Sequence, residues 1–374
     1  MAIRMSLVLL AAAAGTAQVA AANNIHVCPT CAHKTIQSAV NDAVTNDLIT
    51  IAAGRYVENV TIEGKALTLQ GSAVFGQPTE VIAAGRGPVF TLGEGVAGSP
   101  GQLIEMRNLT ITGGNHTGGT GAGGGIQVRA GAYIDLNDSV ITQNYATKGG
   151  GIAIDSPGHS STVTRCQIFN NQATGDATTG GGPGGGVFVG SGSILFINLT
   201  TITGNTATDG GGVFGDIGSA LRIATADITG NTSNPYSTPF GPTAGGGGGL
   251  ELAGTFGIRN SFVSRNLALG PTGGGGMYIS MNAADDHTIE GTIISRNDLK
   301  TSANPDAEGI GAGVVANNTD PVQQTLVLNS VYIVENQEYG GLWLEGVALS
   351  SDNTTVKDNI GGQICTTVDG VCTP

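Results

Sequence analysis

The sequence predicts an all-β solenoid, a parallel β-helix, from three observations. A phrase that ends in asparagine and is followed by glycines recurs along the chain, as where Asn144 precedes Gly149 to Gly151. After the glycines, apolar residues stand two apart, as at Ile152 and Ile154, which is typical of a strand buried on one face. Glycine supplies 63 of the 374 residues. A phrase repeated along the chain indicates a repeat architecture rather than a globular fold.

Each repeat contains three short alternating segments joined by glycine and asparagine corners. We expect three strands per coil, each pairing with the coils on either side at about 4.8 Å. Glycine and asparagine suit the corners because both tolerate positive φ. A leucine-rich solenoid is disfavoured because no repeat contains a helical pattern. The asparagines that close the phrases are Asn115, Asn144, Asn171, Asn205, Asn231, Asn266, Asn297, Asn336 and Asn359, which predicts about eleven or twelve coils.

Composition agrees with a single elongated domain. Charged residues make up 11% of the chain and hydrophobic ones 40%, and stacked repeats bury one continuous core. The net charge of −13 and the pI near 4.6 argue against nucleic acid or an anionic membrane as partners. We therefore expect a soluble, monomeric chain.

The first 22 residues predict a secretory signal peptide. Arg4 gives the positive start, residues 6–14 the apolar run and residues 20–22 a small-residue cleavage site, as export signals require. The run is too short to span a bilayer. A secreted or cell-surface protein that begins near Asn23 is the expectation.

An exported chain allows disulfides. The pairs Cys28 with Cys31 and Cys365 with Cys372 are expected to form two local bridges, one at each end of the chain. Cys166 is left over, at a buried corner. A zinc site would need the flanking histidines as partners, and we expect no metal there.

Residues 35–44 carry apolar side chains at helical spacing. A short helix here would cover the open first coil, as solenoid ends need. The predicted organisation is a cap at 23–46, a β-helix at 47–364 and a disulfide-closed tail at 365–374.

From residue 27 to 72 the chain, VCPTCAHKTIQSAVNDAV followed by ITIAAGRYVENVTIEGKALTLQGS, resembles the cap and first coils of secreted right-handed parallel β-helix proteins of the pectin-lyase-like superfamily. The later phrases are similar to the repeats of bacterial polymorphic outer-membrane proteins. The resemblance implies a right-handed β-helix over nearly the whole mature chain. It does not choose a function, because that fold hosts lyases, hydrolases, esterases, epimerases and adhesins.

The alternation also predicts which side chains face solvent beside the glycines. The first outward row is Gln127, Ala153, Phe188, Phe214, Glu251, Tyr278, Val315 and Trp343, and the second is Arg129, Asp155, Gly190, Asp216, Ala253, Ser280, Asn317 and Glu345. Aromatic rings stack on sugars and carboxylates bind hydroxyls, so Phe188, Phe214, Tyr278, Trp343, Asp155 and Glu345 are the candidate substrate-binding residues. The alternative is that the inserts at 172–183, 232–244 and 298–308 cover these rings.

Asp216 and Glu251 are the candidate catalytic pair, because they lie on neighbouring coils roughly 8 Å apart by strand spacings, as in an inverting glycosidase. Arg265 and Arg296 share a register and either contact an anionic polymer or lie side by side in solvent. Arg259 and Glu290 are expected to form a cross-strand ion pair. No cofactor is predicted, since the turn ending at His287 offers too few oxygen ligands for calcium.

The first functional hypothesis is therefore binding of extracellular polysaccharide or a cell surface through the aromatic row. The second is a polysaccharide lyase or glycoside hydrolase that uses Asp216 and Glu251. The third is a structural surface or matrix protein. Exposure of the aromatic row separates the third hypothesis from the first two.

Overall fold

The computed structural model describes residues 22–367, apart from 97, 99–100, 120, 176–180, 235–236, 239–240, 243–245, 271–272, 282–286, 301–309, 319–321, 338–339 and 361–363. Residues 1–21 of the predicted signal peptide lie outside the described residues. So do Cys372, the predicted bridge partner of Cys365, and parts of each predicted insert.

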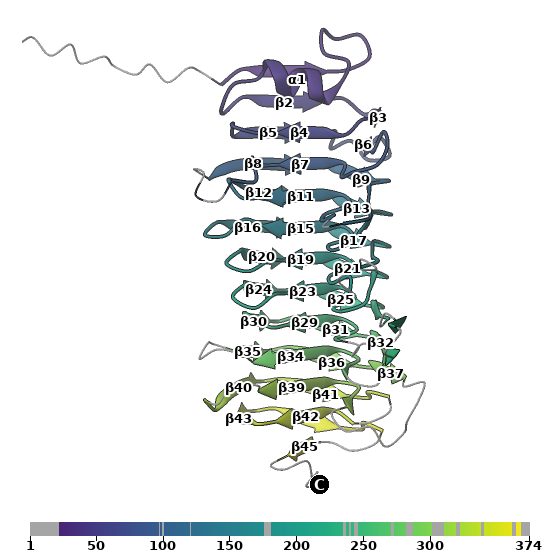
Figure 1. Cartoon of the computed structure of the whole chain (residues 1–374), viewed down its shortest axis with the longest axis vertical. Helices are drawn as coiled ribbons and strands as arrows, with labels where there is room; N and C mark the ends of the chain where they lie inside the picture. The colour runs from purple at the N-terminus through teal and green to yellow at the C-terminus, as the bar shows by residue number, and fades with distance from the viewer. Residues whose placement is uncertain are drawn as a thin grey trace, which may run out of the picture.

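The described chain winds into a right-handed parallel β-helix, as predicted, with one strand per coil in each of three long parallel sheets (Figure 1). Sheet A contains β1 (Asn24–Val27), β2 (Leu48–Ile51), β5 (Leu67–Gln70), β8 (Gln102–Arg107), β12 (Ala132–Asn137), β16 (Ser160–Thr164), β20 (Ile194–Asn198), β24 (Ala220–Ala224), β30 (Thr255–Arg259), β35 (His287–Glu290), β40 (Gln324–Asn329) and β43 (Val347–Asp352).

Sheets B and C have eleven strands each in the described part of the chain. Sheet B contains β3 (Gly54–Val57), β6 (Thr79–Ile82), β9 (Leu109–Thr112), β13 (Val140–Thr142), β17 (Gln167–Phe169), β21 (Thr201–Thr203), β25 (Asp227–Thr229), β31 (Phe262–Ser264), β36 (Ile293–Ser295), β41 (Tyr332–Val334) and β44 (Thr355–Lys357). Sheet C contains β4 (Val60–Ile62), β7 (Phe90–Leu92), β11 (Ile126–Arg129), β15 (Ile152–Asp155), β19 (Val187–Val189), β23 (Val213–Gly215), β29 (Leu250–Leu252), β34 (Met277–Met281), β39 (Val314–Asn318), β42 (Leu342–Glu345) and β45 (Ile364–Thr367).

A fourth parallel sheet, which the sequence analysis did not predict, follows sheet B in the central coils. Sheet D contains β10 (Asn115–His116), β14 (Tyr145–Ala146), β18 (Gln172–Ala173), β22 (Thr206–Ala207), β26 (Thr232–Ser233), β32 (Leu267–Leu269) and β37 (Asp298–Lys300). Most of its strands have only two residues, too few to show an alternating pattern. Two further pairs are β27 (Ser237–Thr238) with β28 (Gly241–Pro242), which is antiparallel, and β33 (Gly273–Gly274) with β38 (Ile310–Gly311).

The chain returns from sheet D to sheet C through the glycine-rich stretches that precede the strands of sheet C, such as those that contain residues 149–151 and 210–212. We call these stretches the return segments. Neighbouring return segments also pair, as at Ala122 with Lys148 and Pro183 with Asp209. The return segments therefore form a layer of their own beside sheet C.

A buried asparagine ladder joins sheets B and D. Each ladder residue before the last donates to the side chain of the next one. The backbone N–H and Nδ2 of Asn205 both donate to Oδ1 of Asn231, each at 3.0 Å, and Nδ2 also donates to the Ile168 carbonyl at 2.9 Å. Its members are Asn144, Asn171, Asn205, Asn231, Asn266, Asn297, Asn336 and Asn359. These bonds satisfy polar groups that burial would otherwise leave unpaired.

The structure corrects two details of the predicted corners. Asn115 is exposed and lies one place beyond the ladder, because Gly114 takes the ladder position and donates its N–H to Asn144 Oδ1 at 2.9 Å. The ladder asparagines do not adopt positive φ. The residue before each one does, as at Gln143 (φ 54°) and Arg265 (φ 55°).

Glycines of the return segments allow close approach to the ladder. A Cβ at Gly212 would lie 2.7 Å from the Gly249 carbonyl oxygen and 3.0 Å from Asn231 Nδ2. The first contact is shorter than side-chain packing permits and the second is tight, so a side chain here would force the backbone to shift. The glycine triplets therefore reflect packing against the asparagine amides.

The capping helix is present as α1 (Ile36–Asp42), within the predicted range, and it lies across the first coil (Figure 1). Glu58 receives the N–H groups of Ile36 (2.7 Å) and Gln37 (2.9 Å). At the other end, Lys65 Nζ donates to the carbonyls of Val40 (2.9 Å) and Ala43 (2.8 Å). Opposite charges thus complement the two ends of the helix dipole.

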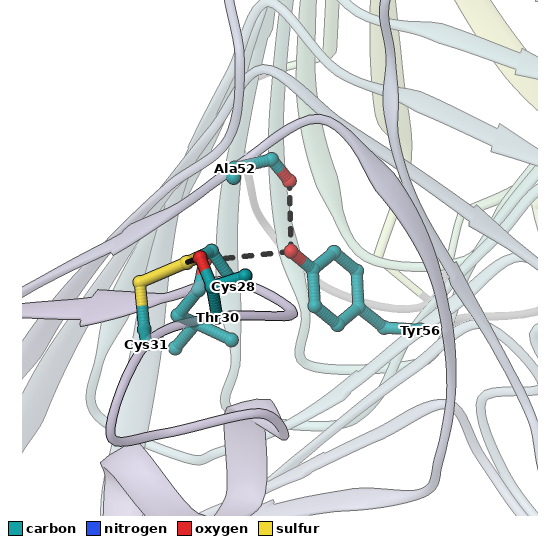
Figure 2. The surroundings of a disulfide bond; sticks show 6 residues. Cys28, Thr30, Cys31, Ala52 and Tyr56 are labelled. Carbon is teal, nitrogen blue, oxygen red and sulfur yellow. Dashed lines mark hydrogen bonds between the residues drawn. A yellow bond between two sulfur atoms is a disulfide. The ribbon is translucent and has the colours of Figure 1, made fainter.

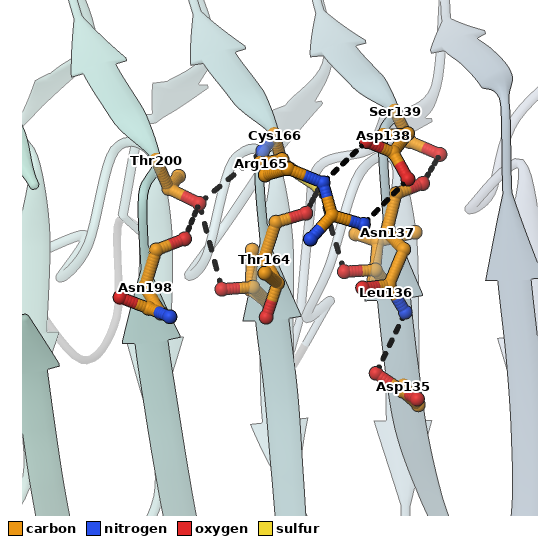
Figure 3. A network of polar contacts seen from close by, with 11 residues as sticks. Asp135, Leu136, Asn137, Asp138, Ser139, Thr164, Arg165, Cys166, Asn198 and Thr200 are labelled. Carbon is orange, nitrogen blue, oxygen red and sulfur yellow. Dashed lines mark hydrogen bonds and ion pairs between the residues drawn. The ribbon is translucent and has the colours of Figure 1, made fainter.

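The first predicted disulfide is confirmed: Cys28 and Cys31 are bonded, with their Cα atoms 5.0 Å apart (Figure 2). Beside it, the Tyr56 hydroxyl donates to the Ala52 carbonyl at 3.0 Å. Cys166 is 2% exposed, as predicted, and its N–H donates to Thr200 Oγ1 at 3.2 Å (Figure 3). Burial raises the pKa of the Cys166 thiol to about 12, so the thiol stays protonated.

Candidate functional site

The outer face of sheet C has the predicted register. The eight residues of the first outward row, from Gln127 to Trp343, pair in sequence across neighbouring strands. Their strand neighbours, such as Leu250 and Leu252 beside Glu251, are buried in the core. The alternation of apolar residues in the sequence therefore predicted the register of this row correctly.

The return segments partly cover this row. Phe188 is only 4% exposed, and Ala153 and Val315 are buried. The Phe188 ring stacks on that of Phe214 with centroids 5.8 Å apart, while Lys148 Nζ lies 4.6 Å from the Phe188 centroid. The expectation that Phe188 is exposed is wrong, because its own coil and the preceding ones fold over it.

Three aromatic residues of the row remain partly accessible. Phe214, Tyr278 and Trp343 are all half-buried. The indole Nε1 of Trp343 is covered and has no hydrogen-bond partner in the described part of the chain. A buried donor without an acceptor is unfavourable, so the exposed part of the ring, not its N–H, is what this residue offers to a ligand.

The second outward row supplies polar groups beside these rings. Ser280, Asn317 and Glu345 are in register on neighbouring coils, and Glu345 is exposed. Burial raises the pKa of the Tyr278 phenol, and the nearby Glu251 and Glu345 raise it further, while a hydrogen bond with the Asn317 side chain opposes the shift. The phenol therefore lies among polar groups of both rows.

Asp155, the other candidate of the second row, lies in the N-terminal half of the face. It is exposed, and its Oδ2 is 3.7 Å from Lys148 Nζ. This carboxylate is separated from the three accessible rings by the covered Phe188. It does not join the cluster around Tyr278.

Glu251 is the most unusual side chain of the face. Its Oε2 is buried without a hydrogen-bond partner among the described residues, and a Cβ at Gly246 would lie 1.5 Å from that oxygen. Burial raises the pKa of Glu251 well above its ordinary value, the nearby Asp209 carboxylate raises it further, and the N–H groups of Gly247 and Gly210 oppose the shift. Glu251 is therefore neutral over part of the pH range in which an exposed glutamate is charged.

The carboxylate that interacts with Glu251 is Asp209, in the return segment of the preceding coil. Burial raises the pKa of Asp209, while the Thr208 hydroxyl, which donates to Oδ2 at 2.9 Å, opposes the shift. The alternating pattern of the sequence does not indicate Asp209. Its only signal is that it directly precedes the glycines 210–212, where the return segment crosses sheet C.

Asp216, the predicted catalytic partner, lies in the turn after β23. Its Oδ1 accepts the Ile217 N–H at 2.8 Å, and it is absent from the groups that shift the pKa of Glu251. The pair of Asp216 with Glu251 stays a prediction, and the carboxyl pair with an electrostatic basis in the structure is Asp209 with Glu251.

The remaining charged candidates are cross-strand pairs. Arg259 and Glu290 form the predicted ion pair at 3.2 Å, and Arg296 contacts Glu335 at 2.7 Å. Within the described ranges, no group of three or more His, Cys, Asp or Glu residues could hold a metal ion. No described helix is long and apolar enough to cross a membrane.

The three parallel sheets define the class of protein: this chain is a right-handed parallel β-helix. No protein-family model matches the sequence, and no curated protein matches it significantly.

Several solved structures are similar to the chain. A protein of Geobacillus virus E2 is 13% identical, with a TM-score of 0.48 over 90% of this chain, and the chain spans 58% of the length of that viral protein. The pectin methylesterase of Aspergillus niger is 11% identical, with a TM-score of 0.37 over 94% of this chain and 91% of the enzyme. The pectate lyase Pel9A is 16% identical, with a TM-score of 0.38 over 91% and 80% of the two chains. At these identities the similarity concerns the fold and assigns no activity.

Proposed function

We propose that this chain is a secreted protein that binds extracellular polysaccharide through the outer face of sheet C, around Phe214, Tyr278 and Trp343. One observation carries the proposal: half-buried rings stand beside Asn317 and Glu345 on the same outer face. Rings stack on the apolar faces of sugars, and amide and carboxylate groups hydrogen-bond to hydroxyls. Phe188 and Asp155 take no part in this binding site.

Secretion rests on the leader-like sequence of residues 1–22 and on the disulfide of Cys28 with Cys31. Disulfides persist in oxidising compartments and are rare in the cytosol. We therefore propose that the protein is a secreted monomer that uses no cofactor. Its proposed partner is a free or cell-surface glycan.

A second candidate function is cleavage of the bound polysaccharide, with Glu251 as general acid and Asp209 beside it. The observation in its favour is the raised pKa of two neighbouring carboxyl groups on the same face as the rings. Glycoside hydrolysis needs a carboxyl group that stays protonated near neutral pH. Burial raises the pKa of Glu251, which favours its protonated form.

The test is retention of the purified mature protein on gels of neutral and uronic-acid polysaccharides, with the supernatant assayed for reducing ends and for unsaturated lyase products. Trp343→Ala should weaken retention strongly, and Trp343→Phe should weaken it less, because phenylalanine keeps an aromatic ring for stacking. Phe262→Ala, which alters an aromatic residue of sheet B that is 51% exposed, should have no effect. Retention that Trp343→Ala leaves unchanged on every polysaccharide would contradict the proposed binding site.

The same assay decides the second candidate. If products form, Glu251→Gln should abolish them while retention persists, because the neutral side chain keeps its shape and loses its proton-donating role. Products that persist in Glu251→Gln, or no products from any polysaccharide, would rule out cleavage by Glu251.

A further inference from the structure

A groove runs around the corner between sheets A and B in the first coils, on a surface separate from the outer face of sheet C. It consists of two adjoining cavities of about 240 Å³ and 440 Å³ that share Asp138 as a wall. The smaller cavity has charged walls and the larger one has mainly apolar walls. The groove is thus charged at one end and mainly apolar at the other.

The polar half is preorganised by contacts among its own side chains (Figure 3). Arg165 forms two hydrogen bonds with Asp138, at 2.7 and 2.8 Å. Asp135 Oδ1 accepts from Asn137 Nδ2 at 2.8 Å and from the Thr162 hydroxyl at 2.5 Å. These bonds hold the Asp135 carboxylate in place and leave its Oδ2 without a hydrogen bond among the described residues.

Glu105 and Arg107 complete this half of the groove on the neighbouring strand β8. They are 3.6 Å apart, a long contact that leaves most of the guanidinium donors of Arg107 available. Three carboxylates and two guanidinium groups line the cavity, so acceptors and donors both face a ligand and the local charge is nearly balanced.

The apolar half is built from the loop between β5 and β6. Phe75 is fully exposed and Val74 is 59% exposed, and both line the larger cavity together with Leu109 and Val140. Neighbouring exposed apolar residues at the mouth of a cavity are typical of a binding surface. A ring in this position contributes nothing to the core and is free to stack on a ligand.

We propose that the corner groove binds a neutral oligosaccharide, with one sugar ring stacked on Phe75 and the hydroxyls of the next hydrogen-bonded to Asp135, Glu105 and Arg107. A saccharide matches both halves, since its C–H faces are apolar and its edges carry hydroxyl donors and acceptors. Uronate polymers fit less well, because the carboxylates outnumber the guanidinium groups by one. This proposal is independent of the site on sheet C and goes beyond it.

The test is calorimetric titration of the full mature chain with cellohexaose and xylohexaose, with hexagalacturonate and a hexalysine peptide as comparison probes. A neutral hexaose should bind, and Phe75→Ala and Asp135→Asn should each weaken binding at least tenfold. Both residues lie at the surface, so neither change should unfold the chain. Phe262→Ala, which removes an exposed ring outside the groove, should not alter binding.

Trp343→Ala separates this groove from the site on sheet C. Hexaose binding that is unaffected by Trp343→Ala and weakened by Phe75→Ala supports the groove whether or not the proposed function holds. Hexaose binding that is insensitive to both groove variants overturns the inference. Binding of hexalysine alone also overturns it, because the groove would then recognise a basic peptide.

Discussion

Glu251 shows how one residue on a regular strand acquires an unusual environment. Its position in β29 would normally place a carboxylate in solvent. The return segments of its own coil and of the preceding coil, at Gly246 and Gly210, lie against the side chain instead. Asp209 adds a second carboxyl group of raised pKa. The two carboxyl groups therefore disfavour each other's ionisation.

A pH-dependent stability follows for Glu251. Its pKa in the folded chain is raised above the ordinary 4.5, so the folded state binds this proton more tightly than the unfolded state does. Stability is fully present below about pH 4.5 and is lost as pH rises through the folded pKa. Glu251→Gln should remove this loss, so the variant should gain stability relative to the natural chain between pH 4 and 8.

Urea unfolding at successive pH values measures this difference, which should exceed the roughly 0.5 kcal/mol typical of a surface substitution. Glu345→Gln is the matched control, since Glu345 is exposed on the same face. A difference between Glu251→Gln and the natural chain that does not change with pH would contradict the assignment.

The capping helix α1 depends on the coil that it covers. It has only seven residues, and isolated helices of that length are not stable in water. Burial of Ile36, Ala39 and Val40 on the first coil holds one side of it. The charged side chains of Glu58 and Lys65, from the coil that it covers, hold its two ends.

Lys65→Met should therefore loosen the cap. The change removes the hydrogen bonds from Nζ to Val40 and Ala43 and the positive charge at the helix C-terminus, which together contribute about 1–2 kcal/mol. We expect that decrease in the free energy of unfolding and faster amide hydrogen exchange over residues 36–42. Lys34→Met is the control, because Lys34 is exposed and its ammonium group forms no ion pair or hydrogen bond with the described residues. Equal exchange in the two variants would show that the cap does not depend on Lys65.

The asparagine ladder operates at the scale of the whole molecule. It runs from Asn144 to Asn359 and connects each coil to the next. Each coil of a solenoid contacts only its neighbours, so stability depends on these interfaces. A single break in the ladder weakens the interface between two coils.

Asn231→Ala should destabilise the chain by about 3 kcal/mol, because the N–H of Asn205 loses its acceptor and the Ile202 carbonyl loses its donor in a buried setting. Asn115→Ala is a matched control from the same repeated phrase. Asn115 is exposed and outside the ladder, so its replacement should change stability by less than about 0.5 kcal/mol. Urea unfolding followed by circular dichroism provides the comparison, and similar losses in the two variants would refute the structural role of the ladder.

The amino-acid sequence was sufficient to predict the solenoid, the register of the outward rows, the capping helix, the first disulfide and the burial of Cys166. Each of these depends on local alternation or spacing, which a linear reading detects. The period also predicted the ladder asparagines except at Asn115, where two glycines displace the phrase by one residue.

The sequence could not predict which outward side chains reach solvent or which acid lies beside Glu251, because both depend on how the coils fold over one another. Phe188 and Phe214 occupy equivalent positions in consecutive coils, yet the first is buried and the second is half-buried. Asp209 is 42 positions before Glu251 in the chain and reaches it only because the return segments stack on one another. The burial of the outward side chains and the proximity of the two carboxyl groups depend on the path of the variable loops between coils. These loops do not repeat along the sequence, so their paths cannot be predicted from the period.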